Sequence, residues 1–291
     1  IYSTYIISLS DFIHEDGKIH TIYNQTLTRT GRLSSSYPNL QNIPTRYEYS
    51  KLIRKAFIPC NDLIMSSDYS QIELRLLAHL SCVPKLVEAF KSGIDIHTKT
   101  AMEIYNVSED LVNAEMRRVA KAVNFGILYG MSGFGLSDAL DININDATEF
   151  ISKYKSAFPG IDEYMKGVIK DAHEKGYVKT IMNRKRIIEE INNTNHVIRH
   201  QGERIALNTP IQGSSADIIK KAMIDLHKAL KDNNFKSTMI LQIHDELIFD
   251  VKKEEEEKLK ELVKNVMENC YKLNVPLEVE INTGINWYDA K

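Results

Sequence analysis

The sequence predicts an α+β fold, with an antiparallel sheet whose strands lie on both sides of a long helical block. Helical patterns of apolar residues dominate from 71 to 232. Apolar segments rich in β-branched residues stand before and after this block, at 56–69, 238–251 and 277–281. With 43% hydrophobic and 26% charged residues among 291, the composition is that of a globular protein of one large or two smaller domains. A helical block inserted between the strands of one sheet is typical of the α+β class.

The N-terminal part predicts short strands and a loop. The turn-rich segment 17–45 is expected to hold a strand or two and then an extended loop. Residues 56–69 predict two strands around an Asn61-Asp62 turn, and the second of these strands ends in Asp68.

The middle and C-terminal parts predict helices and two hairpins. Helices are expected at 71–81, 84–91, 97–105, 109–129, 146–157, 161–175, 197–231 and 254–272. Hairpins are expected at 177–188, around Asn183-Arg184, and at 238–251, around His244-Asp245. A final strand is expected at 277–281.

Charge and cysteine content exclude several classes of protein. The 37 Lys and Arg against 39 Asp and Glu give a net charge of −2, which excludes a globally basic nucleic-acid binder, so any anion site must be local. Cys60, Cys82 and Cys270 are too few for a disulfide framework or a cysteine-based zinc site, and they indicate a reducing compartment. No apolar run approaches the roughly 20 residues that span a bilayer, so no membrane association is expected.

Two acidic strand ends form the first candidate site. Asp68 ends the strand LIMSSDY, and Asp245 with Glu246 forms the tip of ILQIHDELIF. If these strands are neighbours, the carboxylates converge at one end of the sheet, where Mg²⁺ would relieve their repulsion. Two such ions form the clamp used for displacement at phosphorus. The alternative is that each aspartate only caps a turn, and the pattern alone leaves both interpretations open.

A helical stripe forms the second candidate site. In RRVAKAVNFGILYG, Arg117, Lys121, Phe125 and Tyr129 recur every four residues and share one slowly turning face. Two cations followed by two aromatic rings suit a nucleoside triphosphate. On spacing alone, a helix with a basic solvated end and an aromatic core end is the simpler interpretation.

A third group consists of amides and arginines. Arg32, Asn39 and Asn42 lie in TGRLSSSYPNLQNIP, and a later helix carries Arg204, Asn208 and Gln212 on one face. Such side chains can reach acceptors in a duplex minor groove. Polarity of a loop and of a helix surface explains them equally well.

At these residues the sequence closely resembles the family A DNA polymerases. DYSQIELR at 68–75 is similar to the family's motif A, RRVAKAVNFGILYG at 117–130 to motif B, and HDE at 244–246 to motif C. TGRLSSSYPNLQNIP at 30–44 and IQGSSAD at 211–217 are further signatures in the expected order. Five ordered motifs along essentially the whole chain favour the functional interpretation of all three groups.

The resemblance implies a right-hand polymerase architecture without a thumb. It implies an antiparallel-sheet palm formed by 1–75 and 190–291, with a mainly helical fingers subdomain at 76–189 inserted between them. The implied activity is DNA-directed DNA polymerase activity, the transfer of a dNTP to a primer 3′-hydroxyl by a two-metal mechanism in replication and repair. The implied partners are primer–template DNA and dNTP.

The resemblance also implies roles for individual residues in the reaction. Asp68 and Asp245 match the two metal-binding aspartates, and the backbone carbonyl of Tyr69 is expected to help hold one of two Mg²⁺ ions, for which Mn²⁺ is a substitute. Arg117 and Lys121 match the triphosphate ligands, and Lys121 is also the expected proton donor to pyrophosphate.

The remaining matched positions surround the nucleotide and the DNA. Gln71 and His97 match further residues around the nucleotide, and Phe125 matches the position that packs on the sugar of the nucleotide. Glu73 matches the family's steric gate against ribonucleotides, and Tyr129 matches the partner of this gate beside the template base. Arg32, Gln212 and His244 match contacts near the primer terminus, and Asn39, Asn42, Arg204 and Asn208 match template or minor-groove contacts.

The sequence departs from the family in its extent. The family's thumb, its 3′→5′ exonuclease-like domain and its 5′-nuclease domain are absent from these 291 residues, and the first residue is Ile rather than Met. We therefore expect a monomeric fragment of a longer parent chain from the bacterial cytosol, with an organelle as the alternative source. Two other functions stay open: a catalytically weak fragment that only binds primer–template, and a relative of the single-subunit RNA polymerases, which Glu73 and Phe125 disfavour.

Overall fold

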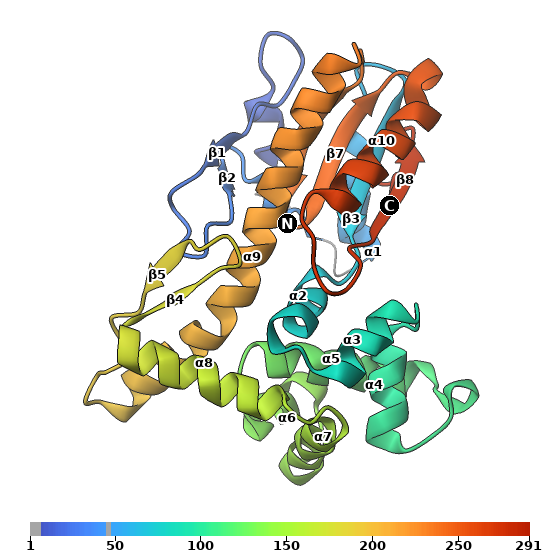
Figure 1. Ribbon diagram of the computed structural model, residues 1–291. Helices are drawn as coiled ribbons and strands as arrows, with labels where there is room; N and C mark the ends of the chain where they lie inside the picture. Colours follow the sequence, from blue (N-terminus) through green and yellow to red (C-terminus); the bar gives the residue numbers. More distant parts are fainter. Residues whose placement is uncertain (1–6, 45–47) are drawn as a thin grey trace. The chain divides into compact units, whose positions relative to one another are not determined.

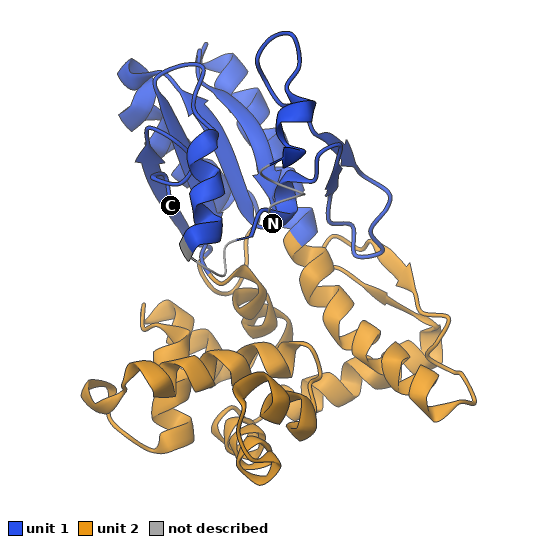
Figure 2. Cartoon of the chain, turned by 180° about the vertical axis from the view of Figure 1, so that it is seen from behind, with its two compact units in different colours: residues 1–70, 216–271, 277–291 blue, residues 71–215, 272–276 orange. Residues whose placement is uncertain are grey.

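The computed structural model describes residues 7–44 and 48–291, and the chain divides into two compact units (Figure 2). Unit 1 consists of residues 1–70, 216–271 and 277–291, and unit 2 of residues 71–215 and 272–276. Residues 1–6 and 45–47, parts of the segment expected to begin the palm, lie outside the described residues. None of the described helices combines the length and the apolar character that a membrane-spanning segment needs.

Unit 1 is built on a four-stranded antiparallel sheet. Its strand order is β6 (Thr238–Ile243), β7 (Glu246–Val251), β3 (Leu63–Tyr69) and β8 (Val279–Gly284) (Figure 1). The central strand β3 therefore pairs with two strands that lie far from it in the sequence. The predicted α+β fold with an antiparallel sheet is confirmed, although the last strand begins two residues later than expected.

The two faces of this sheet follow the alternation of side chains along β3. Met65, Ser67 and Tyr69 point to the face covered by α10 (Glu256–Asn269), where the Tyr69 hydroxyl donates to the carbonyl of Met267 (2.7 Å). Ile64, Ser66 and Asp68 point to the opposite face. The strand thus buries apolar residues on both faces and presents a carboxylate only at its end.

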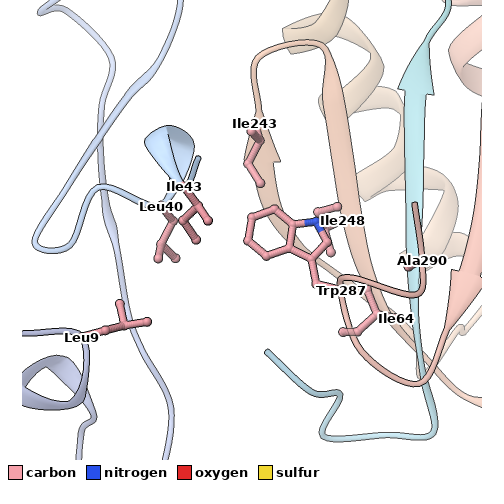
Figure 3. Close-up of a cluster of buried hydrophobic side chains, with 8 residues drawn as sticks. All are labelled: Leu9, Leu40, Ile43, Ile64, Ile243, Ile248, Trp287 and Ala290. Carbon is pink, nitrogen blue, oxygen red and sulfur yellow. The ribbon is translucent and has the colours of Figure 1, made fainter. Parts of the chain in front are cut away.

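The second face of the sheet carries a hydrophobic core around Trp287 (Figure 3). The core consists of Leu9, Leu40, Ile43, Ile64, Ile243, Ile248, Trp287 and Ala290. From the N-terminal part, η3 (Leu40–Asn42) contributes Leu40 to this core, and Ile53 of η4 (Leu52–Ala56) packs against it. The other short elements of this part are η2 (Ser10–Phe12), β1 (Ile22–Asn24), β2 (Ser34–Ser36) and α1 (Glu48–Lys51). The expected short strands at 17–45 exist and pair with each other.

One predicted strand of unit 1 is wrong. The first strand expected within 56–69 does not form, and residues 57–62 are irregular. The carbonyl of Phe57 accepts from the backbone N–H of Trp287 (3.0 Å), and Pro59 has no N–H to donate to a sheet. This segment is therefore held by single contacts to the core rather than by a ladder.

Unit 2 is mainly helical. It contains α2 (Ile72–Ser81), α3 (Pro84–Lys91), α4 (Ile96–Tyr105), η5 (Glu109–Leu111), α5 (Ala114–Leu128), α6 (Gly133–Leu140), α7 (Ile144–Ala157), α8 (Ile161–Lys175), and the hairpin of β4 (Tyr177–Lys179) and β5 (Lys185–Ile187). The helix α9 (His196–Asp232) is divided between the units: its residues up to Ser215 belong to unit 2 and the rest to unit 1. The short helix η6 (Lys253–Glu255) belongs to unit 1.

The helix expected at 109–129 starts later than predicted. Asn113 caps α5 by accepting from the backbone N–H of Met116 (2.9 Å), so the preceding η5 is a separate turn. Helix α6 was not predicted, because Gly133 and Gly135 lower helix propensity. Ser132 caps this helix by accepting from Gly135 N (3.3 Å).

Gly202 in α9 offers a test of close packing in unit 2. A Cβ atom there would lie 2.8 Å from the carbonyl carbon of Glu190 and 2.8 Å from the nitrogen of Ile191, and these backbone atoms cannot rotate away. We expect Gly202→Ala to lower the free energy of unfolding by about 1–3 kcal/mol. Gly167→Ala in α8 is the matched control, since nothing lies within 4 Å of its Cβ position; it should stabilise by about 0.5–1 kcal/mol. Equal effects of the two variants in urea unfolding would contradict the close approach.

Candidate functional site

The turn between β6 and β7 carries Asp245 to the end of β3. Ile243 pairs with Glu246, so His244 and Asp245 form a two-residue turn. His244 has φ +54°, a left-handed conformation that is uncommon outside glycine. The backbone N–H of Tyr69 donates to the carbonyl of Asp245 (3.2 Å). Asp68 and Asp245 therefore lie at the same end of the sheet, as the sequence predicted.

Negative charge is concentrated at this end of the sheet. Asp68 is the register partner of Glu246 on one side and of Glu280 on the other, and directly opposed residues share a face. The pKa of Asp68 is raised to about 6, chiefly by burial; the charges of Glu246, Asp245 and Glu280 add to this rise, and that of Lys291 opposes it. The nearest cation to Asp68 is only partly effective, since Lys291 Nζ stands 3.9 Å from its Oδ2. This crowding of carboxylates is what a divalent cation would relieve.

Asp68 and Asp245 line one cavity of unit 1, with a volume of about 810 Å³. Asn42 and His244, two of the predicted DNA contacts, line the same cavity. Arg32, a third, lies beside it, with Nη2 4.0 Å from Asp245 Oδ2. The structure thus brings these five predicted residues together.

Asn39 and Glu246 have mainly structural contacts. The side chain of Asn39 accepts from the backbone N–H of Gln41 (3.0 Å) and caps η3. Glu246 is buried, accepts from Ser66 Oγ (2.6 Å) and pairs with Lys291 Nζ (2.5 Å). Glu246 also lines the cavity with Asp68 and Asp245, and its charge raises the pKa of Asp68.

The donor set fits Mg²⁺ better than a transition metal. Among the described residues, no three His, Cys, Asp or Glu side chains form a group that could hold a metal ion. Zinc sites in proteins need three or four such ligands. Mg²⁺ keeps several waters and is bound through one or two carboxylates together with substrate phosphates. The pair of Asp68 and Asp245 therefore suits Mg²⁺.

The helical stripe of unit 2 lies on α5. Arg117, Lys121 and Phe125 lie within the helix, and Tyr129 is its C-cap. The rings of Phe125 and Tyr129 stack, with centroids 6.4 Å apart and planes 15° from parallel. The Tyr129 hydroxyl donates to Glu73 Oε2 (2.9 Å), which fixes the buried Glu73 carboxylate.

Asp95 joins two of the predicted nucleotide contacts. Arg117 donates to it through Nε (2.9 Å) and Nη2 (3.0 Å), and Gln71 donates through Nε2 (3.2 Å). The carboxylate also caps α4 by accepting from the backbone N–H of Thr98 (2.8 Å). The structure thus connects Gln71 and Arg117 through a residue that the sequence argument did not single out.

A buried chain of polar groups orients His97. The amide nitrogen of the fully buried Asn124 donates to His97 Nδ1 (3.1 Å) and contacts Thr100 Oγ1 (3.1 Å). With Nδ1 as an acceptor, the neutral ring carries its proton on Nε2. Burial lowers the pKa of His97 to about 4; Asp95 raises it, and Arg117 and Lys121 lower it. His97 is therefore a neutral donor at physiological pH.

We expect this neutral histidine to make the free energy of unfolding depend on pH. The unfolded chain takes up a proton at His97 near pH 6.5 and the folded chain only near 4. Between these values the unfolded state binds more protons, so stability falls as the pH falls, by up to about 1.4 kcal/mol per pH unit. Urea unfolding at pH 7 and pH 5 should show this loss in the parent chain but less of it in His97→Gln. His227→Gln, at an exposed position of α9, is the control that should keep the parent's pH dependence.

The later polar group lies on α9. Arg204 is exposed, and its Nε donates to the carbonyl of Tyr129 (3.4 Å). Asn208 and Gln212 follow at helical spacing and are partly buried. Arg204 is therefore the member of this group that contacts the end of α5.

Almost the whole chain matches the model of a protein family. Residues 1–289 match the family described as DNA polymerase family A. The chain belongs to the family A DNA polymerases. It is 53% identical over 294 aligned positions to DNA polymerase I of Geobacillus stearothermophilus and to that of Bacillus subtilis, with all of this chain covered in each case.

A solved structure is also similar to this chain. The POL domain of Pol1 from M. smegmatis, in complex with DNA primer-template and dNTP, superposes with a TM-score of 0.94 at 44% identity over 97% of this chain and 50% of that chain. The chain spans 34% of the Geobacillus relative and 33% of the Bacillus relative. It therefore corresponds to about a third of these polymerases.

In this family A chain, Asp95 and Arg54 lie beside predicted site residues but were not predicted from the sequence. Asp95 directly precedes Ile96 and His97 and is the N-cap of α4, a position at which an aspartate is usually structural. Arg54 is buried, and its Nε and Nη1 have no hydrogen-bond partner among residues 7–44 and 48–291. Its guanidinium lies 4.2 Å from the centroid of Trp287 and lines the cavity with Asp68. Neither residue stands in a pattern that indicates a site.

Proposed function

We propose that this chain carries the nucleotidyl-transfer function of a DNA-directed DNA polymerase, adding dNTPs to a primer 3′-hydroxyl. The observation that supports it best is the convergence of Asp68 and Asp245 at one sheet end, in surroundings that raise the pKa of Asp68. We assign residues 1–75 and 190–291 to the palm and residues 76–189 to the fingers. The relatives are named DNA polymerase I, and the similar M. smegmatis structure contains primer-template and dNTP.

In unit 1, Asp68, Asp245 and the backbone carbonyl of Tyr69 would hold two Mg²⁺ ions. Bound there, the ions would lower the pKa of the primer hydroxyl and neutralise charge on the pyrophosphate leaving group. The protein's own part is to keep two carboxylates at fixed positions: Asp68 by the central strand, and Asp245 by a tight turn. Phosphoryl transfer depends mainly on such positioning and charge neutralisation.

In unit 2, Arg117 and Lys121 would bind the triphosphate. Lys121 is exposed on the same helix face and would give its proton to the leaving pyrophosphate. His97, neutral with its proton on Nε2, would donate a hydrogen bond to a phosphate oxygen, and Gln71 would add a second polar contact. Each of these groups acts on charge that develops during transfer.

Recognition of the sugar and base would rest on three residues. Phe125 would pack on the deoxyribose. Glu73, held by the hydroxyl of Tyr129 (2.9 Å), would occupy the space that a 2′-hydroxyl needs. This hydrogen bond would keep the Glu73 carboxylate from moving aside for a 2′-hydroxyl, so the chain would discriminate strongly against ribonucleotides.

Contacts to DNA would come from both units. Near the primer terminus we assign Arg32, His244 and Gln212, and along the template and minor groove Asn39, Asn42, Arg204 and Asn208. Arg and Asn side chains bind acceptors that all base pairs present in the minor groove, so the contacts would be independent of sequence. We further propose that the chain acts as a monomer at the bacterial nucleoid.

Primer extension with Mg²⁺ tests this function. The chain should extend a primer with dNTPs and much more slowly with NTPs; comparable extension with NTPs would contradict the role of Glu73 as a steric gate. Binding of primer–template without any extension would favour the DNA-binding fragment.

A further inference from the structure

Asp95 occupies the Nε–Nη2 edge of Arg117, one of the two edges at which a guanidinium can bind a phosphate through paired hydrogen bonds. The Asp95 carboxylate accepts from Nε (2.9 Å) and Nη2 (3.0 Å), so two parallel hydrogen bonds hold the guanidinium. Such a fork matches carboxylate and phosphate equally well. The side chain of Arg117 is 48% exposed, so a dissolved anion can reach it.

The carboxylate of Asp95 is held in place and stays ionised. It caps α4 through the backbone N–H (2.8 Å) and the hydroxyl (2.9 Å) of Thr98, and Gln71 donates to its other oxygen (3.2 Å). Burial raises its pKa, but the hydrogen bonds from Arg117 and Thr98 outweigh this and bring the pKa down to about 2. Asp95 therefore cannot follow Arg117 if that side chain turns toward another anion.

We propose that Asp95 is a specificity-determining residue whose carboxylate competes with nucleotide phosphates for Arg117. This inference rests on the proposed function, in which Arg117 is a triphosphate ligand. A nucleotide whose phosphates take the Nε–Nη2 edge of Arg117 must replace the Asp95 carboxylate there, so these phosphates must bring enough negative charge to compensate. Gln71, bound to the same carboxylate, is freed in the same exchange.

The competition acts only on ligands that reach Arg117. A triphosphate that displaces Asp95 loses binding free energy equal to that of the ion pair, because the pair must break first. A monophosphate that binds without Arg117 leaves the ion pair intact and loses nothing. Removing the charge of Asp95 should therefore tighten triphosphate binding and leave monophosphate binding unchanged.

Asp95→Asn tests this inference. Asparagine is an equally good N-cap, so α4 keeps its cap while the competing charge is lost. The dissociation constants of dATP and of dAMP are measured separately by titration calorimetry in the presence of Mg²⁺, for the 291-residue parent chain and for the variant. We expect Asp95→Asn to lower the dissociation constant of dATP about threefold to tenfold, the range for a partly exposed ion pair of good geometry, and to leave that of dAMP unchanged.

Glu115→Gln is the matched control. Glu115 holds Arg118, the neighbour of Arg117, by the same kind of fork, with Nε at 2.8 Å and Nη2 at 2.6 Å. The substitution changes the net charge by the same amount and frees an arginine one position away. It should leave dATP binding unchanged, and an equal gain in both variants would mean that general electrostatic attraction, not competition at Arg117, explains the effect.

The double variant Asp95→Asn/Arg117→Ala traces the effect to one side chain. If Asp95 acts through Arg117, removing its charge should give no gain once Arg117 is alanine. Unchanged or weaker dATP binding by Asp95→Asn alone would overturn the competition. No dATP binding by the parent or by any variant would instead overturn the triphosphate site of the proposed function, and the inference with it.

Discussion

Asp245→Asn is expected to reduce primer extension by at least about a thousandfold, equivalent to roughly 4 kcal/mol of transition-state stabilisation. Asparagine keeps the size of the side chain and the backbone carbonyl that accepts from Tyr69 N (3.2 Å), so the turn should form as before. What is lost is one of two charges that would hold Mg²⁺. Single-turnover extension of a labelled primer, with the chain in excess over DNA, measures this loss.

The same variant separates a catalytic effect from a folding effect. Asp245 raises the pKa of Asp68, so its removal relieves repulsion at the sheet end. The free energy of unfolding should therefore stay the same or rise while extension is lost. A loss of both would indicate that the aspartate supports the turn rather than the reaction.

Asp250→Asn is the control on the same strand. Asp250 lies at the opposite end of β7 and accepts from the backbone N–H of Asn61 (2.9 Å), a hydrogen bond that asparagine can also accept. This variant should extend primers like the parent chain. If Asp245→Asn extends within tenfold of the parent, the two-aspartate assignment is wrong.

Helices were predictable from the sequence because their signal is local. The helices expected at 84–91 and 161–175 have the observed bounds. Pro84 marks the start of the first helix, and Gly160 and Gly176 mark the two ends of the second. The first strand expected within 56–69 does not form, and Phe57 packs instead against Trp287, which lies 230 positions further along the chain. Long-range contacts of this kind leave no periodic trace in the sequence.

The candidate site could be predicted only in part for the same reason. The nearness of Asp68 to Asp245 required that β3 and β7 pair, and periodicity indicates strands but not their partners. The register that places Glu246 and Glu280 on both sides of Asp68 appears only in the folded sheet. Asp95 was missed because one side chain performs two tasks, capping a helix and holding an arginine.

Trp287→Ala is expected to lower the free energy of unfolding of unit 1 by about 3–5 kcal/mol. The indole is 1% exposed and stands within the core of unit 1 (Figure 3). It meets the ring of Phe57 edge-on at 5.4 Å, so alanine would leave a cavity and remove an aromatic contact. Urea unfolding followed by circular dichroism measures the change, and a loss below about 1 kcal/mol would contradict the central position of the ring.

Trp287→Phe separates the packing of the core from its effect on the site. Trp287 Nε1 is buried without a hydrogen-bond partner among the described residues, so phenylalanine removes an unsatisfied N–H and should cost much less than alanine. The guanidinium of Arg54 lies 4.2 Å from the ring centroid, and the charges of Glu246 and Asp68 act on it. An aromatic ring at 287 should hold Arg54 beside these carboxylates, whereas alanine would release it. Trp287→Phe is therefore expected to keep primer extension. Trp287→Ala is expected to lose primer extension even at temperatures at which the chain is still folded. Equal activity of the two folded variants would mean that the ring supports only the core.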